Sequence, residues 1–280
     1  MSTRTTTTTL RVRSEPGCRV DAAGLLPAAL AALPLAEIGR IVLPAGNERC
    51  AAGDLFDISR TEGDGTGNDA ALVIEGEVPW LDHLGAHLAE GCIDVHGSSG
   101  NHAGFRMAGG ELRISGNTGD FTGCQMSGGR LTVGGDGGDF TAGPLPGAME
   151  GMTGGTLTIH GNTGARLGDR MRRGLVLVGG DAGECAASRL VAGTIGIAGK
   201  LAPHFGYGMR RGTLLLVQAP ASLPPTFTGG GQGIDVFWSL LVRSFAAEIA
   251  PFSTLKASSL PRRYTGDLAV DGRGELLLVG

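Results

Sequence analysis

A repeat of nineteen residues runs through the middle of the chain and constrains the fold more than any other feature. Seven rows of this repeat begin at Leu88, Met107, Met126, Met152, Met171, Leu190 and Met209, with one insertion, PLPGAME, at 144–150. The fourth residue of every row is glycine, and the sixth and eighth are always aliphatic, as in Leu112 and Ile114. A unit with one short alternating strand cannot bury its apolar face alone, so we expect the rows to stack.

Stacked strands, about 4.8 Å apart, predict an all-β solenoid. More specifically, the rows predict a parallel β-helix of 19-residue turns with small mixed N-terminal and C-terminal flanking segments. The sixth and eighth positions and the row-starting methionines then point inward, while the seventh points outward. The polar side chains that follow the first glycine corner are expected to satisfy turn amides: Asn117, Asp136, Asn162 and Asp181. The insertion at 144–150 should protrude as a loop without breaking the stack.

The pattern divides the chain into an N-terminal flanking segment (1–71), a repeat domain (72–217) and a C-terminal helix and hairpin segment (218–280). In the first segment, LRVR and RIVLP are candidate strands and residues 25–39 a short helical stretch. GDLFDIS and AALVIEG look like degenerate first turns of the repeat. An apolar stripe predicts a helix within 233–252, and 267–279 is typical of a hairpin. The members of that stripe are Val236, Leu240, Leu241 and Phe245.

Composition excludes several classes. A net charge of −4 gives no electrostatic case for nucleic-acid binding. Five scattered cysteines fit reduced thiols better than disulfides or a zinc site. The start of the chain has no apolar export signal, and the apolar stretch nearby is broken by Pro27 and Pro34, so we expect a cytoplasmic protein with no membrane span.

Catalytic signatures are absent from the sequence, so no catalytic residue and no metal ligand is predicted. His83 and His87 have the spacing of a metal-ligand pair, but without further ligands a surface or capping role is expected. His102 and His204 share the fifteenth position of their rows, too far apart to act together. Acidic residues in the glycine-rich turns do not recur in every row, which argues against a calcium-binding repeat.

Charge is distributed unevenly along the rows. Residues 71–165 hold three Lys or Arg and ten Asp or Glu, a net charge of −7, whereas residues 166–211 hold eight and three, a net charge of +5. Six arginines of the basic part are expected to crowd one edge, where they either bind a partner or an anion, or pair with acids of the flanking segments and meet water. These candidate binding residues are Arg170, Arg172, Arg173, Arg189, Arg210 and Arg211.

The rows MAGGELRISGNTGDFTGCQMSGGRLTVGG and MTGGTLTIHGNTGARLGDRMRRGLVLVGG resemble a repeat domain found in two protein families. These are the C-terminal region of glutamate synthase and the C subunit of formylmethanofuran dehydrogenase. The whole chain is similar to the free-standing C subunit, which occurs in a tungsten or molybdenum dehydrogenase and in a related bacterial formyltransferase/hydrolase complex. The Ala- and Arg-rich composition favours the bacterial complex.

The resemblance implies a non-catalytic scaffold subunit in a one-carbon pathway of methylotrophs. In that complex a formyl group passes from formyl-tetrahydromethanopterin, through a methanofuran-like carrier, to formate. The resemblance also implies a hetero-oligomer with three partners: an amidohydrolase-like A subunit that performs hydrolysis, a B subunit, and a formyltransferase D subunit. No cofactor is expected in this chain itself. The dehydrogenase version and a stand-alone β-helix binding protein remain as alternatives.

Overall fold

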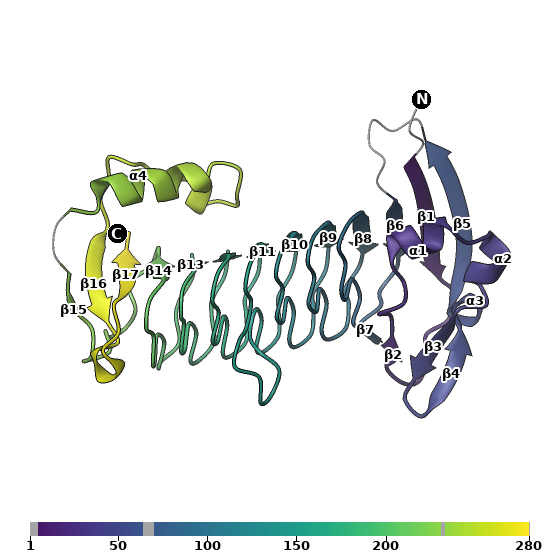
Figure 1. The fold of residues 1–280 in the computed structure, drawn as a ribbon, viewed down its shortest axis with the longest axis horizontal. Helices are drawn as coiled ribbons and strands as arrows, with labels where there is room; N and C mark the ends of the chain where they lie inside the picture. Colours follow the sequence, from purple (N-terminus) through teal and green to yellow (C-terminus); the bar gives the residue numbers. More distant parts are fainter. Residues whose placement is uncertain (1–4, 64–69, 231–232, 280) are drawn as a thin grey trace.

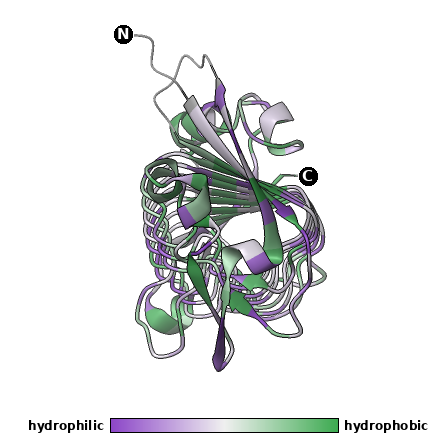
Figure 2. Ribbon diagram, turned by 90° about the vertical axis from the view of Figure 1, so that its right-hand side faces the viewer, coloured by the Kyte–Doolittle hydropathy of each residue, from purple (hydrophilic) through white to green (hydrophobic). Residues whose placement is uncertain are grey.

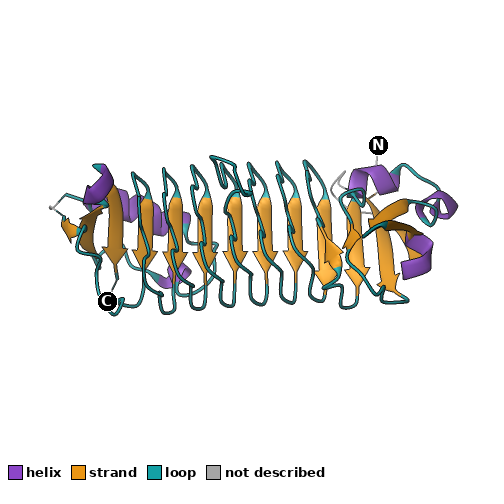
Figure 3. Ribbon diagram, turned by 90° about the horizontal axis from the view of Figure 1, so that it is seen from below, coloured by secondary structure: helices purple, strands orange, loops and turns teal. Residues whose placement is uncertain are grey.

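The computed structural model describes residues 5–63, 70–230 and 233–279. The molecule is a long rod in which each row contributes one strand to a shared sheet (Figure 1). These strands pair in parallel and in register, so that Leu112 faces Leu131 of the next row, and Figure 3 shows them side by side. They are β8 (Cys92–His96), β9 (Glu111–Ile114), β10 (Arg130–Val133), β11 (Thr156–Ile159), β12 (Leu175–Val178), β13 (Thr194–Ile197) and β14 (Thr213–Leu216).

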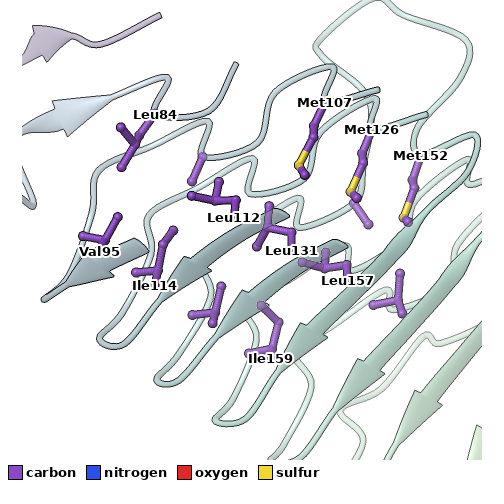
Figure 4. Close-up of a cluster of buried hydrophobic side chains, with 14 of the residues drawn as sticks. Leu84, Val95, Met107, Leu112, Ile114, Met126, Leu131, Met152, Leu157 and Ile159 are labelled. Carbon is purple, nitrogen blue, oxygen red and sulfur yellow. The ribbon is translucent and has the colours of Figure 1, made fainter. Parts of the chain in front are cut away.

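The inward positions of the rows form a hydrophobic core along the rod. Leu112 is 0% exposed and Ile114 is 2% exposed, and the methionines that begin the rows lie in line beside them (Figure 4). Viewed along the long axis, successive rows superimpose around this interior (Figure 2). Burying an aliphatic or methionine side chain contributes about 1.5–3 kcal/mol, so the stack is stabilised chiefly by this repeated burial.

Glycine is needed at the fourth position because two rows approach closely there. Gly110 has a φ of +68°, and a Cβ on it would lie 2.6 Å from the carbonyl oxygen of Gly91 in the preceding row. A side chain would therefore meet both backbone strain and a clash. This close approach explains why glycine occupies the position in every row.

Polar side chains at the first corner accept hydrogen bonds from turn amides, as predicted, and these amides belong to the next row, so the side chains form a ladder between rows. The Asn117 Oδ1 accepts a hydrogen bond from the Asp136 amide at 2.8 Å, and the Asp136 Oδ1 accepts one from the Asn162 amide at 2.6 Å. Asn162 and Asp181 continue the pattern, which ends at the Lys200 amide. Each side chain satisfies an amide in the next row, so the ladder ties the turns together.

The insertion at 144–150 lies outside the stack. It extends from the rod as a loop between β10 and β11, while these two strands remain paired in register (Figure 1). Met149 in this loop is 72% exposed, unlike the buried methionines that begin the rows.

The N-terminal part extends the same sheet and adds a second one. β6 pairs in parallel with β8, which confirms that AALVIEG belongs to the repeat. The interpretation of GDLFDIS as a first turn is wrong, because its strand pairs antiparallel with β1. The helical stretch divides into two short helices separated by Pro34. The elements are β1 (Thr5–Val12), β2 (Val20–Asp21), α1 (Pro27–Ala31), α2 (Leu35–Ile38), β3 (Val42–Ala45), β4 (Glu48–Ala51), α3 (Ala52–Leu55), β5 (Phe56–Gly63), β6 (Ala71–Glu75) and β7 (Leu81–Asp82).

The C-terminal part ends the sheet with a hairpin, but not the one predicted. β17 pairs in parallel with β14 and antiparallel with β16, so the hairpin partner lies before residue 267 rather than within 267–279. The predicted helix is present but ends at Ser244. The elements are β15 (Thr228–Gly229), α4 (Asp235–Ser244), the 3-10 turn η1 (Phe252–Thr254), β16 (Arg262–Gly266), the 3-10 turn η2 (Leu268–Val270) and β17 (Gly274–Leu278).

The C-terminal segment also covers the outer face of the last rows. Leu177 and Leu215 occupy the seventh, outward position, yet both are 0% exposed because they pack with Trp238, Phe245 and Phe252. At Gly196 between them, a Cβ would lie 2.7 Å from the Phe252 ring. Farther along, the Arg130 guanidinium donates two hydrogen bonds, of 2.9 and 3.1 Å, to the carboxylate of Glu248. The segment thus reaches back over the sheet as far as β10.

The predicted fold class, an all-β parallel β-helix solenoid, is wrong. The finding that overturns it is one mixed sheet of 13 strands among the described residues, in the order β15-β16-β17-β14-β13-β12-β11-β10-β9-β8-β6-β1-β5. A second sheet, of four strands, has the order β4-β3-β2-β7, and short helices lie at both ends.

The physical reason lies in the second half of each row. Phe121, Gly123 and Gln125 have φ values of 60°, 64° and 55°, and such left-handed residues cannot continue an extended strand. The second half of each row leads through turns to the next strand of the sheet. The turns of neighbouring rows are joined by isolated β-bridges, such as the one between Thr163 and Ala182. The division at residues 71 and 217 stays a prediction.

Candidate functional site

Four of the six predicted arginines line one groove on the edge of the rod. Arg172 and Arg173 follow Met171, and Arg210 and Arg211 follow Met209 two rows later. The row between them supplies Val191 and Ala192 as the floor, and the cavity has a volume of about 390 Å³. We call these six residues the basic groove.

Row stacking explains why these residues meet. The amide of Arg172 donates to the Met152 carbonyl at 2.8 Å, and that of Arg210 donates to the Leu190 carbonyl at 2.8 Å. Met171 and Met209 are 0% exposed and anchor the two rows in the core. The two arginines that follow each methionine therefore lie at the surface, and the two pairs are separated by the one row between them.

The basic groove carries more positive than negative charge. The Nε of Arg172 lies 2.8 Å from the Glu150 carboxylate of the insertion loop. Within residues 5–63, 70–230 and 233–279, no ion pair is found for Arg173, Arg210 or Arg211. All four guanidiniums belong to exposed residues, so three of them face solvent without a carboxylate.

The structure places the other two predicted arginines away from the groove. The Arg189 guanidinium pairs with Asp169, whose side chain is 2% exposed, and its Nε donates to the Asp169 Oδ1 at 2.9 Å. The Ser188 hydroxyl donates to the same carboxylate at 3.0 Å. Arg170 donates to the Ala148 carbonyl at 3.1 Å. Arg189 therefore neutralises a buried acid and Arg170 holds the insertion loop, while the binding role predicted for the six arginines stays a prediction.

The insertion loop contacts the groove at Arg172, which sequence reasoning missed. Besides the contact with Arg170, the Gln125 side chain donates to the Glu150 carbonyl at 3.3 Å. These two contacts position the Glu150 carboxylate beside Arg172. The only signal in the sequence was that the insertion ends in an acid, Glu150, two residues before the next row begins at Met152.

The histidines form a stack that sequence reasoning also missed. The ring centroids of His83 and His102 are 4.7 Å apart, those of His102 and Phe121 5.0 Å, and those of Phe121 and Phe140 5.0 Å. The Arg166 guanidinium lies 5.6 Å from the Phe140 centroid and extends the stack. The recurrence of rings at the fifteenth position was the signal for it.

The surroundings of His102 in this stack shift its pKa downward. Burial lowers the pKa of His102, and the neighbouring His83 lowers it further, against the opposing effect of nearby carboxylates. The Nδ1 of His83 lies 3.2 Å from a carboxylate oxygen of Asp21. His83 is half-buried and its ring stacks on His102, so the structure does not place it at the surface as expected.

The cysteines form no disulfide. All five have free thiols, and burial raises the pKa of Cys92 to about 11 and that of Cys124 to about 12. At pH 7 these two thiols are therefore protonated. Over the part of the chain that the structure describes, no cluster of three or more His, Cys, Asp or Glu residues is arranged to hold a metal ion. None of the helices in that part is long and apolar enough to cross a membrane.

The chain is similar to proteins of Methylorubrum extorquens. Over 92 residues it is 42% identical to the C subunit of that organism's formyltransferase/hydrolase complex Fhc, which is 33% of this chain and 32% of that protein. The match thus spans about a third of the curated relative's length. A crystal structure of the FhcABCD formyltransferase/hydrolase complex of Methylorubrum extorquens, in complex with methylofuran, contains a chain with 40% identity and a TM-score of 0.88. That match covers 97% of this chain and 99% of the other. No protein-family model matches the chain.

Proposed function

The chain belongs to the family of the C subunit of the formyltransferase/hydrolase complex, and from this premise we propose that it is a scaffold subunit of such a complex without an active site of its own. The observation that carries the proposal is the continuous sheet, which joins the N-terminal, repeat and C-terminal parts into one rod. Stacked repeats offer long, rigid surfaces on which partners are held at set distances. A subunit with this shape suits the positioning of enzymes.

The proposed partners are the A, B and D subunits. The solved complex that contains the similar chain is named FhcABCD, which supports this set. We assign hydrolysis to the amidohydrolase-like A subunit, and formyl transfer to the D subunit. The complex would then pass a formyl group from formyl-tetrahydromethanopterin to formate through a methanofuran-like carrier in the cytoplasm. The methylofuran in the solved complex supports a carrier of that class.

The dehydrogenase version of the complex is the weaker candidate. Both similar proteins carry the name of the formyltransferase/hydrolase complex, and neither is named as a tungsten or molybdenum enzyme. The proposal therefore contains no metal centre and no cofactor in this chain.

The test is reconstitution of the complex with and without this chain. We expect the A, B and D subunits to form smaller assemblies when the chain is omitted, because its rigid surface is absent, and formyl transfer to lose its coupling to hydrolysis. Native mass spectrometry measures assembly, and a coupled assay that follows formate measures turnover. Intact assembly and full turnover without the chain would contradict the proposal.

Single substitutions separate a scaffold from an enzyme. Changing any one exposed polar residue, for example His160→Ala, should leave the hydrolysis rate of the assembled complex nearly unchanged. A hundredfold loss of rate from one such change, with assembly intact, would show that the chain carries catalytic groups.

A further inference from the structure

We propose that the basic groove, formed by Arg172, Arg173, Val191, Ala192, Arg210 and Arg211, binds an extended acidic segment of a partner protein in the complex through its carboxylates. This inference rests on the proposed function, since it identifies which surface of the scaffold a partner contacts and by what chemistry.

The structure already contains one carboxylate at this site. Glu150 of the insertion loop pairs with the Nε of Arg172 at 2.8 Å, and the loop is held there by Arg170 and Gln125. Guanidinium groups bind carboxylates with charge-assisted hydrogen bonds that are stronger than neutral ones. Arg172 therefore already binds a carboxylate, and Arg173, Arg210 and Arg211 have no ion pair among the described residues.

Repulsion among these arginines favours an external acid. The two arginine pairs lie two rows apart, about 10 Å at the spacing of paired strands. Like charges at this distance repel at low ionic strength, although solvent and salt screen them, and the repulsion is relieved when negative charge lies between them. Glu150 pairs with Arg172, and no other acid of residues 71–165 forms an ion pair with a groove arginine among the described residues.

The shape of the groove favours a peptide over a small anion. Its floor consists of Val191 and Ala192, which present apolar surface between the arginine pairs. A single small anion held by the guanidiniums leaves this apolar floor in water. An extended chain rises about 3.3 Å per residue, so acidic residues two to four positions apart reach both pairs while the segment covers the floor.

The first experiment measures binding of the whole chain to a preassembled complex of the A, B and D subunits. The variant Arg173→Ser, Arg210→Ser, Arg211→Ser removes the three unpaired guanidiniums and keeps the pair between Arg172 and Glu150. A matched control, Arg13→Ser, Arg40→Ser, Arg49→Ser, removes the same charge from exposed positions in the N-terminal part. Thermal unfolding establishes that both variants are folded.

We expect the groove variant to raise the dissociation constant at least tenfold at low ionic strength and to flatten its dependence on salt. The control should change the dissociation constant less than threefold. If the groove variant binds with wild-type affinity and salt dependence, the inference is wrong. Failure of the wild-type chain itself to bind would instead overturn the proposed function, and the inference with it.

The second experiment identifies what occupies the groove. A photo-crosslinking amino acid at Val191, in the assembled complex, should react with a partner segment that has two or more acidic residues within five positions. Sequencing of the crosslinked peptide provides the readout. A crosslink to a segment without acids, to a non-protein molecule, or to nothing would contradict the inference.

Discussion

The acidic and basic parts of the repeat use their charge in different ways. In residues 71–165 most carboxylates accept hydrogen bonds within the chain. Four of them accept a hydrogen bond from a backbone amide of the next row: Asp82, Asp120, Asp136 and Asp139. In residues 166–211, Arg173, Arg210 and Arg211 have no carboxylate partner among the residues that the structure describes. The comparison teaches that the acids stabilise the stack, whereas three of the arginines have no ion pair among the described residues.

The largest effect should come from the core, which the two parts share. Leu112→Asp and Val176→Asp each place a charge at a position that is 0% exposed, one in the acidic and one in the basic part. An unpaired buried charge costs several kcal/mol, so both variants should lose soluble, folded protein. Soluble yield and thermal unfolding measure this. The control Ser115→Asp, at an exposed position, should fold normally, and a stable Leu112→Asp protein would disprove the stacked core.

A buried acid beside the basic part provides the next test. Burial favours a higher pKa for Asp267, but hydrogen bonds from the Thr226 side chain and from the Gly208 and Ala269 amides lower it below its ordinary value of 3.8. Because the folded-state pKa is lowered, this carboxylate stabilises the fold above pH 3.8 and loses that effect as pH falls through the lowered pKa.

Asp267→Asn should therefore be less stable than the wild type at pH 7, with the two unfolding curves converging as pH falls below 3.8. Urea unfolding between pH 2 and 7 measures the difference. A gap that is constant with pH would show that ionisation of Asp267 does not contribute.

The ladder of polar side chains begins in the acidic part and continues into the basic part, where Asp181 accepts a hydrogen bond from the Lys200 amide. Asp136→Ala removes the acceptor of the Asn162 amide and should lower the free energy of unfolding by about 1 kcal/mol. Asp136→Asn keeps an acceptor oxygen and should lower the free energy of unfolding by less than Asp136→Ala does. Equal losses in the two variants, measured by urea unfolding, would mean that charge rather than hydrogen bonding matters here.

The smallest effect on stability is expected in the basic groove. Arg210→Ser with Arg211→Ser removes exposed guanidiniums for which the described residues provide no ion pair, so the free energy of unfolding should change by less than about 0.5 kcal/mol. At low salt the change should be slightly stabilising, because repulsion is relieved. A loss of more than about 1 kcal/mol would place these arginines among the structural residues and remove the contrast between the two parts.

Several features of the rod's interior could be predicted because they repeat. The sixth and eighth positions are aliphatic in every row, and seven recurrences of one pattern outweigh the weak propensity of any single strand. The turn acceptors Asn117 and Asp136 were predictable for the same reason. The fold class was not, because the strands outside the repeat join its sheet, and their pairing depends on contacts distant in sequence.

The candidate site was predictable only in part. Arg172 and Arg210 occupy the same position of their rows, which predicted that they lie on one edge. The local sequence did not show that Arg189, unlike them, would pair with an acid within the chain. Arg189 donates a hydrogen bond to Asp169, which lies twenty residues earlier and is buried in the preceding row. The apolar seventh position at Leu177 and Leu215 was the one sequence signal for the covering segment, and its meaning became clear only with Phe252 and Trp238 in place.

The sequence by itself determined where the strands lie in each row, which side chains face inward, and which corners require glycine. These properties follow from periodicity and from the geometry of a few neighbouring residues. Only the tertiary structure decided that β5 and β16 pair antiparallel at the two ends of the sheet, and which arginines stay without a carboxylate among the described residues. Strand pairing and ion pairing depend on groups that meet in space, and residues such as Glu150 and Arg172 meet only once an inserted loop folds back on the stack.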